Sequence, residues 1–422
     1  MRRAIVLVLD GLRRDMIAPG LTPNLVAFAA TAESFAAHRS MFPSATLVVS
    51  SCVSTGCHPV RHELQGNSLV LIEDGRLVGH DAGHPGFLQH KRRVTGHSLA
   101  VPTMAERLKA HGGAVIYANV SPGAAYKHDP DGHGHLYHRA GSFGPGRVPL
   151  TDWDASRLTI DAAGDRTMAE RFIADAVLGV RKPALGLMWL AEPDYSSHAH
   201  PLGSAAQLDA VRGADATAGL VMAAVAEARA AGDDILLLVA SDHGHQTVSG
   251  VIDIEAELVA AGLKAAPGSG DVLSMSNGTS ALIYLHPEHA SRIGAIGAFL
   301  QAQPWAGDVI GADRLAEVGH GPQQGLAFAV AMAATEEPNQ HGIPGMSYAA
   351  KPAAGKHDRL GCGQHGGLAR FEQSPFLLAN GPGFKAGAIR TTPSSAIDIA
   401  PTVLTHTGVA FEGLDGRALQ AT

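Results

Sequence analysis

Cysteine, aromatic residues and excess positive charge are all scarce in this chain. The three cysteines, Cys52, Cys57 and Cys362, are too few, and odd in number, for a disulfide framework. Aromatic residues make up 5%, and 32 basic residues face 39 acidic ones, for a net charge of -7. An acidic balance argues against a general nucleic-acid surface. A nucleic-acid polymer is therefore not expected as a partner.

Long apolar runs are also missing. No stretch approaches the roughly 20 apolar residues of a membrane span. The apolar run 4–9 is too short for the core of a signal peptide, and Asp10 interrupts it. We therefore expect a cytoplasmic protein that has no membrane partner.

Apolar runs of strand length alternate with helical patterns along the chain. The runs 4–9, 115–119, 185–190, 235–240 and 375–379 predict buried strands. Helices are predicted to open at Thr22-Pro23-Asn24, to span 46–54 with Gly56 closing the end, and to span 205–231. This alternation indicates an α/β fold with a mostly parallel central sheet.

Two long ranges depart from this alternation, 69–181 and 252–358. The first is rich in Gly, His and Pro, and the second mixes short strand-like and helical patterns. We expect one catalytic domain over residues 1–422, with these two ranges as insertions that form a cap at the ligand edge of the sheet.

Carboxylates and imidazoles follow several predicted strands, and one more imidazole lies in the glycine-rich string GCGQHGG. They are Asp10, Asp194, His198, Asp242, His243 and His365. The carboxyl ends of parallel strands meet at one edge of an open α/β sheet, where ligands bind. Taken singly, each residue could belong to a polar surface turn. Three Asp and three His together suit two adjacent divalent cations, with an oxygen nucleophile completing one shell.

These segments resemble the type I phosphodiesterase/nucleotide pyrophosphatase branch of the alkaline phosphatase superfamily. The matching strings are LVLDGLRRDM, TPNL, FPSAT with STG nine residues on, EPDYSSH, SDHGH, GQHGG and IDIAPTVLTHTGVAFEGLDGRAL. They follow the family order over nearly the whole chain. The resemblance implies a three-layer α/β/α sandwich and a two-metal hydrolase of phosphoric esters.

The resemblance also implies how the metal ligands divide. One ion would be held by Asp194, His198 and His365. The other would be held by Asp10, Asp242, His243 and the nucleophile. His245, in the same SDHGH string, has no ligand role in the family pattern. Three His among six protein ligands favour Zn²⁺ over Mn²⁺.

Three residues compete for the role of nucleophile: Ser44, Thr46 and Cys57. Residues 57–61 fit C-x-P-x-R, the string that sulfatases convert to formylglycine. The sulfatase cysteine precedes a Thr-Gly pair by nine residues, whereas here Thr46 stands nine residues before Thr55-Gly56. At a predicted helix N-terminus, the alkoxide of Thr46 would face the positive end of the helix dipole. We predict Thr46 as the nucleophile and a phospho-threonine intermediate.

Asn67 stands 21 residues after Thr46, the family spacing for an amide that holds a non-bridging phosphate oxygen. This residue favours diesterases, because monoesterases of the superfamily usually add an arginine there. Nucleotide-cleaving members place an aromatic residue directly after the nucleophile, whereas this chain has Leu47. Trp189 or Tyr195 could supply a stacking face instead.

The substrate is the least determined property. We expect a small phosphorylated compound, namely a diester, a nucleotide or a phosphonate. Alternatives are a phosphonoacetate hydrolase-like enzyme that breaks a C–P bond, a phosphomonoesterase of the same superfamily, or a non-catalytic metal-binding homologue. Basic residues and histidines of the range 69–181 form either a solvated loop or a binding site for an anionic group beside the phosphorus. They are Lys91, Arg92, Arg93, Lys127, His128, His133, His135, His138 and Arg139.

Overall fold

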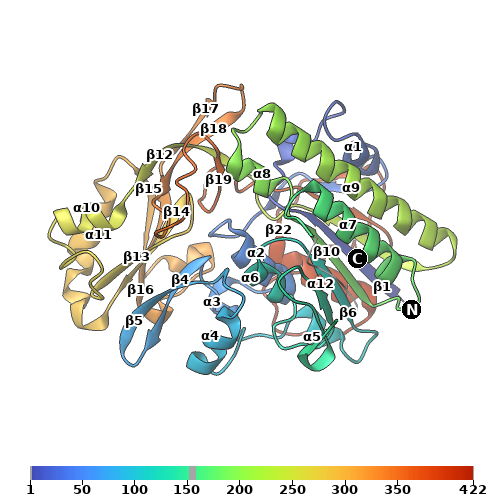
Figure 1. Cartoon of the computed structure of the whole chain (residues 1–422), viewed down its shortest axis with the longest axis horizontal. Helices are drawn as coiled ribbons and strands as arrows, with labels where there is room; N and C mark the ends of the chain where they lie inside the picture. Colours follow the sequence, from blue (N-terminus) through green and yellow to red (C-terminus); the bar gives the residue numbers. More distant parts are fainter. Residues whose placement is uncertain (1, 152–157, 422) are drawn as a thin grey trace.

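A ten-stranded, mostly parallel sheet forms the centre of the protein (Figure 1). The structure is a computed structural model and describes residues 2–151 and 158–421. The strand order is β21-β2-β20-β11-β1-β10-β6-β7-β8-β9. The parallel core consists of β11 (Asp234–Ala240), β1 (Arg2–Leu9), β10 (Leu185–Leu190), β6 (Ala114–Ala118) and β7 (His135–Tyr137). The edges add β20 (Leu377–Asn380), β2 (Glu33–Phe35), β21 (Ile389–Arg390), β8 (Phe143–Gly144) and β9 (Val148–Pro149).

The strands predicted from apolar runs are confirmed. Runs 4–9, 115–119, 185–190 and 235–240 correspond to β1, β6, β10 and β11, whose residues from 4, 114, 185 and 235 onward are all buried. The run 375–379 overlaps β20, which pairs antiparallel with β11. Continuous apolar sequence is typical of strands that are covered on both faces.

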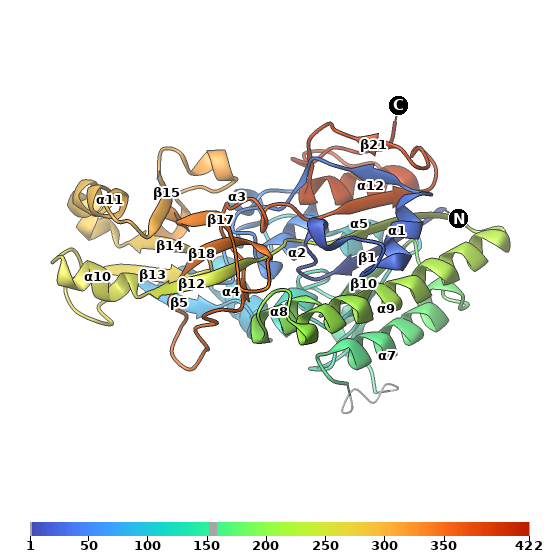
Figure 2. The same cartoon turned by 90° about the horizontal axis from the view of Figure 1, so that it is seen from above.

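Alternate residues of β1 show that the sheet has two covered faces. Ile5, Leu7 and Leu9 share one core with α9 (Ala205–Ala230), α7 (Ala162–Phe172) and α1 (Pro23–Ala29). Ala4, Val6 and Val8 share the other core with α2 (Thr46–Thr55), α5 (Met104–Leu108), α6 (Pro122–Tyr126) and α12 (Ile399–Thr407). Figure 2 shows the helices α7 and α9 on one side of β1 and α12 on the other. The α/β/α sandwich is therefore confirmed.

A second lobe lies at one end of the central sheet (Figure 1). Its antiparallel sheet has the order β13 (Val272–Ser276), β14 (Ser280–Leu285), β16 (Leu326–Met332), β15 (Ala306–Gly311). The helices α10 (Ile254–Ala260) and α11 (Ile293–Gln301) pack against it. Another four-stranded sheet has the order β17 (Ala334–Pro338), β18 (Pro344–Ala350), β12 (Gln246–Ile252), β19 (Gly363–Gln364). Most of this lobe comes from the range 252–358.

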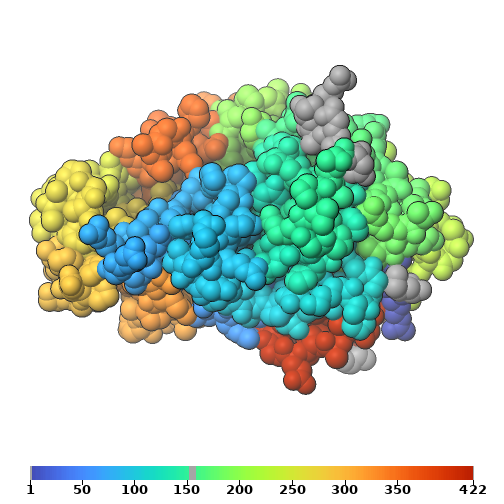
Figure 3. Space-filling model, turned by 60° about the horizontal axis from the view of Figure 1, so that its bottom comes forward, coloured from blue at the N-terminus to red at the C-terminus, as the bar shows by residue number. Residues whose placement is uncertain are grey.

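The range 69–181 has two different locations in the fold. The hairpin of β4 (Ser68–Glu73) and β5 (Arg76–Asp81), followed by α4 (Phe87–Thr95), lies next to the second lobe (Figure 3). Residues 114–149 supply β6 to β9, so this part extends the central sheet and is not an insertion at its edge. The expectation of one long insertion is wrong here, because the buried run 114–118 pairs directly with β10. The cap role of the remaining segments stays a prediction.

Short elements complete the fold. They are β3 (His38–Arg39), which pairs with β22 (Ser394–Ser395), and the helices α3 (Pro59–His62) and α8 (Asp194–Ala199). In the described part of the chain, no helix combines the length and the apolar character needed to cross a membrane.

The first helix receives its N-terminal cap from a distant helix. Asp215 of α9 is buried, and its carboxylate accepts hydrogen bonds from the backbone N–H groups of Asn24 (3.1 Å) and Leu25 (2.8 Å). It also accepts one from the Asn24 side chain at 2.8 Å. Free N–H groups at a helix start need such acceptors, and here the acceptor ties α1 to α9.

We predict that Asp215→Ala lowers the free energy of unfolding by about 2 kcal/mol, because three donors lose a buried acceptor. Asp209→Ala is the matched control on the same helix, since within the described ranges its exposed carboxylate pairs only with Arg212 one turn away. This control should change stability by less than about 0.5 kcal/mol. Urea denaturation of the three chains measures the difference, and equal losses would contradict the capping role.

Candidate metal centre

Three adjacent parallel strands deliver carboxylates to one edge of the sheet. Asp10 directly follows β1, Asp194 begins α8 shortly after β10, and Asp242 follows β11. The strand β1 lies between β10 and β11, so the three turns are neighbours. The sequence prediction that these residues meet at the carboxyl edge is confirmed.

Close approach of these turns requires a glycine at position 11. Its φ of +67° lies in the left-handed region. A Cβ there would meet the Cε1 atom of His245 at 2.4 Å and Cβ of Asp194 at 3.0 Å. The Gly11 N–H also donates to Oδ1 of Asp242 at 3.0 Å. Any side chain at this position would push the turns apart.

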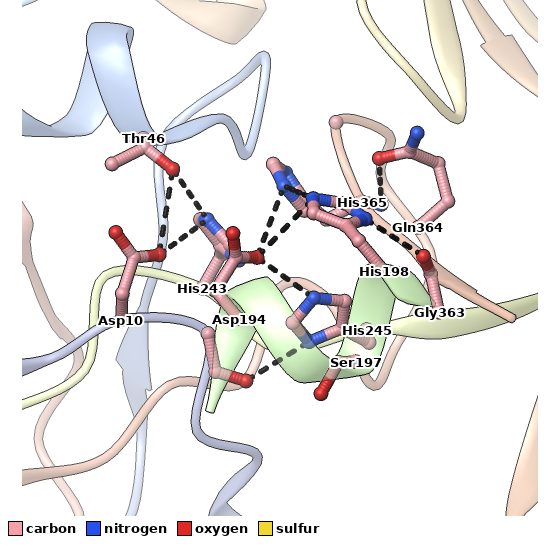
Figure 4. A network of polar contacts seen from close by, with 12 residues as sticks. Asp10, Thr46, Asp194, Ser197, His198, His243, His245, Gly363, Gln364 and His365 are labelled. Atoms are coloured by element: carbon pink, nitrogen blue, oxygen red, sulfur yellow. Dashed lines mark hydrogen bonds and ion pairs between the residues drawn. The ribbon is translucent and has the colours of Figure 1, made fainter. Parts of the chain in front are cut away.

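A first cluster forms around one oxygen of Asp194 (Figure 4). Its Oδ1 lies 3.4 Å from Nε2 of His198, 3.4 Å from Nε2 of His365 and 2.9 Å from Nε2 of His245. Asp194 and His198 are four residues apart on α8, so they share one face of that helix. His365 reaches the cluster from the glycine-rich segment after β19. The four side chains could hold one metal ion.

A second cluster consists of Asp10, Asp242 and His243, with Thr46 beside it. Nε2 of His243 lies 3.4 Å from Oδ1 of Asp10, 3.2 Å from Oδ2 of Asp242 and 3.1 Å from Oγ1 of Thr46. Oγ1 of Thr46 lies 3.4 Å from Oδ1 of Asp10. All four residues are buried. This set could hold a second ion with the Thr46 hydroxyl as a further ligand.

The histidines are oriented as metal ligands usually are. In each ring, Nδ1 lies 2.7 to 3.0 Å from a backbone carbonyl oxygen, which can only accept a hydrogen bond. The pairs are His198 with Gly363, His243 with Gly244, His245 with Gly11, and His365 with Ser44. Nδ1 therefore carries the proton, and in a neutral ring Nε2 keeps its lone pair toward the cluster.

Electrostatics also favour a bound cation at these clusters. Burial raises the pKa of Asp242 to about 8, and the nearby Asp194 carboxylate adds to the shift. Burial, with the charges of Asp242 and Asp194, raises the pKa of Asp10 well above its usual range. Burial lowers the pKa of His243 to about 3, so this ring is neutral at neutral pH. Neutral imidazoles and crowded carboxylates suit a divalent cation.

Burial alone would raise the pKa of Asp194, but the imidazoles of His198, His245 and His365 outweigh it and lower the pKa well below its usual range. Oδ2 of Asp242 is buried and finds no hydrogen-bond partner among the described residues. Among the described residues, no Lys or Arg forms an ion pair with any of the three carboxylates. The residues present therefore fit the two divalent cations expected from the sequence.

Of the three candidate nucleophiles, only Thr46 lines the cavity at this site. Thr46 is the first residue of α2, which ends at Gly56 with φ +70°, as the sequence predicted. The hydroxyl of Ser44 donates to the Gly367 carbonyl at 3.0 Å and accepts from the Gly366 N–H. Cys57 is fully buried, and burial raises the pKa of its thiol. Both alternatives are directed into the protein.

Asn67 lies on the same cavity wall as Thr46. Its Oδ1 accepts a hydrogen bond from the Leu47 N–H at 3.2 Å, which links it to the first turn of α2. Its backbone N–H donates to Oδ1 of Asn277 at 2.6 Å. The side-chain NH₂ group donates to none of the described residues, so it is available to a ligand in the cavity.

The cavity has a volume of about 360 Å³ and is large enough for a small phosphorylated compound. Its lining includes Asp10, Thr46, Asn67, Asp194, Tyr195, His198, Lys356, Arg359 and His365. Tyr195 is 48% exposed, whereas Trp189 is fully buried and donates its indole N–H to Asp10 at 3.0 Å. Trp189 is therefore excluded as a stacking face for the substrate, because its ring lies in the core and holds the Asp10 carboxylate through this hydrogen bond.

The basic residues expected to bind an anion lie elsewhere. None of the nine Lys, Arg and His residues named from the range 69–181 lines this cavity. Lys91, Lys127, His128 and His138 are buried, so the solvated-loop interpretation is wrong for these four. The ammonium group of Lys127, for example, donates to the carbonyls of Ala82 and Gly123.

Sequence reasoning missed the cations that do line the cavity, Lys356 and Arg359. They stand nine and six residues before His365. This proximity to a predicted ligand was the only signal in the sequence that pointed to them.

The fold is similar to the folds of several solved structures. The mouse ectonucleotide pyrophosphatase/phosphodiesterase 5 has a TM-score of 0.68 at 17% identity, over 98% of this chain and 97% of that one. An inactive variant of the mouse protein with one threonine replaced by alanine, in complex with AMP, has a TM-score of 0.68 at 16% identity, over 99% and 97%. The human protein has a TM-score of 0.66 at 16% identity, over 98% and 97%.

The fold and the site thus define a hydrolase with an alkaline phosphatase-like sandwich. Residues 4–297 match the sequence profile of the type I phosphodiesterase / nucleotide pyrophosphatase family. The chain belongs to this family and is accordingly an enzyme that acts on phosphoric esters. No curated protein matches the sequence.

We predict that Zn²⁺ or Mn²⁺ raises the Tm of chelator-treated protein, since ions that bind only the folded state stabilise it. Each ion at 100 times its dissociation constant contributes about 2.7 kcal/mol. Metal analysis should find two ions per chain, and His243→Ala should lose one of them. His111→Ala, at an exposed histidine, is the control and should keep both. An unchanged Tm and no bound metal would contradict the assignment.

Proposed function

We propose that this enzyme is a two-metal phosphodiesterase/nucleotide pyrophosphatase in which Thr46 is the nucleophile. The observation that carries the proposal is the position of the Thr46 hydroxyl. It lies at the start of α2, on the cavity wall, 3.1 Å from Nε2 of His243 and 3.4 Å from Oδ1 of Asp10. The structurally similar mouse protein that is inactive after a threonine-to-alanine change supports this choice.

Two sets of residues would hold the ions. Asp194, His198 and His365 form one set, and Asp10, Asp242, His243 and Thr46 form the other. Zn²⁺ suits them best, because imidazole nitrogens and carboxylate oxygens are its preferred ligands. When bound, the ions would lower the pKa of the Thr46 hydroxyl and neutralise charge on the phosphoryl oxygens. His245, at 2.9 Å from Oδ1 of Asp194, would orient that carboxylate from the Gly11 turn.

The residues of the chain account for both steps of hydrolysis. The alkoxide of Thr46 attacks phosphorus in line, a Thr46 Oγ1–P bond forms, and the bond to the leaving oxygen breaks. Water then attacks the phosphorus of the phospho-threonine and loses a proton to the solvent, the bond from phosphorus to Oγ1 breaks, and Thr46 leaves as the alkoxide. The side-chain NH₂ of Asn67 would donate to a non-bridging oxygen, on which negative charge grows in the transition state.

A nucleotide is the substrate that the surroundings favour. The AMP complex of the mouse neighbour supports nucleotide binding in this fold. Leu47 offers no stacking face, but Tyr195 lies on the cavity wall and is about half exposed. Its ring would pack on a base or on another planar group of the substrate.

We predict that Thr46→Ala lowers the turnover of bis-p-nitrophenyl phosphate by at least about two to three decades, because the attacking oxygen is lost. Metal content should stay at the wild-type value, which separates loss of chemistry from loss of the site. Cys57→Ser is the control and should change turnover by only a few-fold. Wild-type turnover by the alanine variant would refute the nucleophile, and a large loss in the serine variant would restore the formylglycine alternative.

We predict that Asn67→Ala lowers kcat by about 10²-fold with a small change in KM, since the amide acts mainly on the transition state. Steady-state kinetics on the same diester provides the measurement. Asn339→Ala is a suitable control, because its side chain bonds Leu202 and Thr247 outside the cavity. A change confined to KM would show that Asn67 only binds the ground state.

A further inference from the structure

Arg359 is a cation that lies beside the two clusters of candidate metal ligands. It lines the main cavity, and also an adjoining cavity of about 160 Å³ that shares His198 and His365 with it. Among the described residues, no side chain forms a hydrogen bond or an ion pair with its guanidinium group. A guanidinium retains its charge even when it is partly buried. Burying part of an unpaired charge costs free energy, and an anionic ligand bound to the half-buried Arg359 would offset this cost.

The backbone at Arg359 has an unusual conformation. Its φ is +59°, in the left-handed region that residues other than glycine, asparagine and aspartate seldom adopt. Such conformations cost free energy and occur most often at ligand sites. The segment leads from β18 to β19 and directly on to His365. The arginine and a metal-ligand candidate therefore lie on one short stretch of chain.

The second cation of this segment is already neutralised. The ammonium group of Lys356 lies 2.7 Å from Oδ2 of Asp81, which belongs to β5 on the other side of the cavity. This ion pair links the segment to β5 without adding net charge. Arg359 is therefore the cavity-lining cation whose charge is left for a ligand.

The side of the site on which Arg359 lies indicates which part of the substrate it meets. Figure 4 shows Thr46 and Asp10 on one side of the site and His198 and His365 on the other. Arg359 belongs to the second side, because it lies close enough to His198 and Asp194 for their charges to interact and its segment leads directly to His365. In-line attack by Thr46 sends the leaving group away from Thr46, and so toward this second side.

We propose that Arg359 binds an anionic substituent on the leaving group, a phosphate or a carboxylate, and selects substrates that carry one. Two divalent cations would balance the charges of Asp10, Asp194, Asp242 and the Thr46 alkoxide, which leaves the charge of Arg359 for the substrate. The proposal rests on the function proposed above. It assigns to Arg359 a specificity role that the basic residues of the range 69–181 do not fill.

Three derivatives of one nucleoside 5′-phosphate test the proposal. Their leaving groups are 4-hydroxybenzoate, the neutral and similarly shaped 4-hydroxybenzamide, and inorganic phosphate, supplied as the nucleoside 5′-diphosphate. We compare Arg359→Asn, whose side chain tolerates the left-handed backbone, with wild type and with Arg359→Lys. Arg370→Asn is the matched control, since Arg370 is exposed and pairs with Glu336 outside the cavity.

We expect Arg359→Asn to lower kcat/KM at least about tenfold for the substrates with one or both anionic leaving groups, because a charge-assisted hydrogen bond to the leaving group is lost. The benzamide ester should change by less than about threefold, and Arg359→Lys should recover part of the loss. The anionic substrate with the larger loss in kcat/KM shows whether Arg359 binds a phosphate or a carboxylate on the leaving group. Equal losses on all three substrates would overturn the proposal, because Arg359 would then contact the transferred phosphoryl group. No loss on any substrate would overturn it as well.

A binding measurement separates this proposal from the proposed function. In the Thr46→Ala background, calorimetry measures the affinity for the uncleaved benzoate and benzamide esters. Adding Arg359→Asn should weaken binding of the benzoate ester at least about tenfold and leave the benzamide ester nearly unchanged. If wild type cleaves none of the substrates, the proposed function fails, while this difference in binding still decides the role of Arg359.

Discussion

The crowding of three carboxylates at one edge of the sheet is the constraint on which the rest of this structure depends. Asp10, Asp194 and Asp242 meet because they follow β1, β10 and β11, three adjacent parallel strands. Burial raises the pKa of Asp10 and Asp242, and no Lys or Arg in the described part of the chain forms an ion pair with any of the three carboxylates. A folded chain tolerates such crowding when cations can bind between the carboxylates.

Much of the surrounding structure holds these ligands in place. Backbone carbonyls accept the Nδ1 proton of each histidine in the two clusters, so that Nε2 points toward the site. The indole of Trp189 and the N–H of Gly11 donate to Asp10 and Asp242. These contacts come from the core and from turns, whose geometry is set by the packing of the sheet between its two helical layers.

The groups proposed to meet the substrate come from less regular parts of the chain. Thr46 opens a helix, Asn67 precedes the β4–β5 hairpin, Tyr195 is exposed on α8, and Arg359 lies between two short strands. This division matches a general property of α/β enzymes, in which the sheet supplies a constant centre and the connecting segments set the choice of substrate. The leaving-group role of Arg359 fits this division, since the metal ligands themselves do not distinguish one phosphoric ester from another.

The sequence alone predicted five strands of the central sheet, β1, β6, β10, β11 and β20, and the residues of the two clusters other than His245. Buried strands are continuous apolar runs, and ligands at strand ends keep a fixed order along the chain, so both can be read locally. The tertiary structure alone decided that residues 135–149 extend the sheet, that Lys127 is internal, and that Ser44 is directed away from the cavity. It also brought Arg359 to the cavity. These properties depend on contacts between residues far apart in the sequence, and no local pattern of polarity specifies which long-range partner a side chain meets.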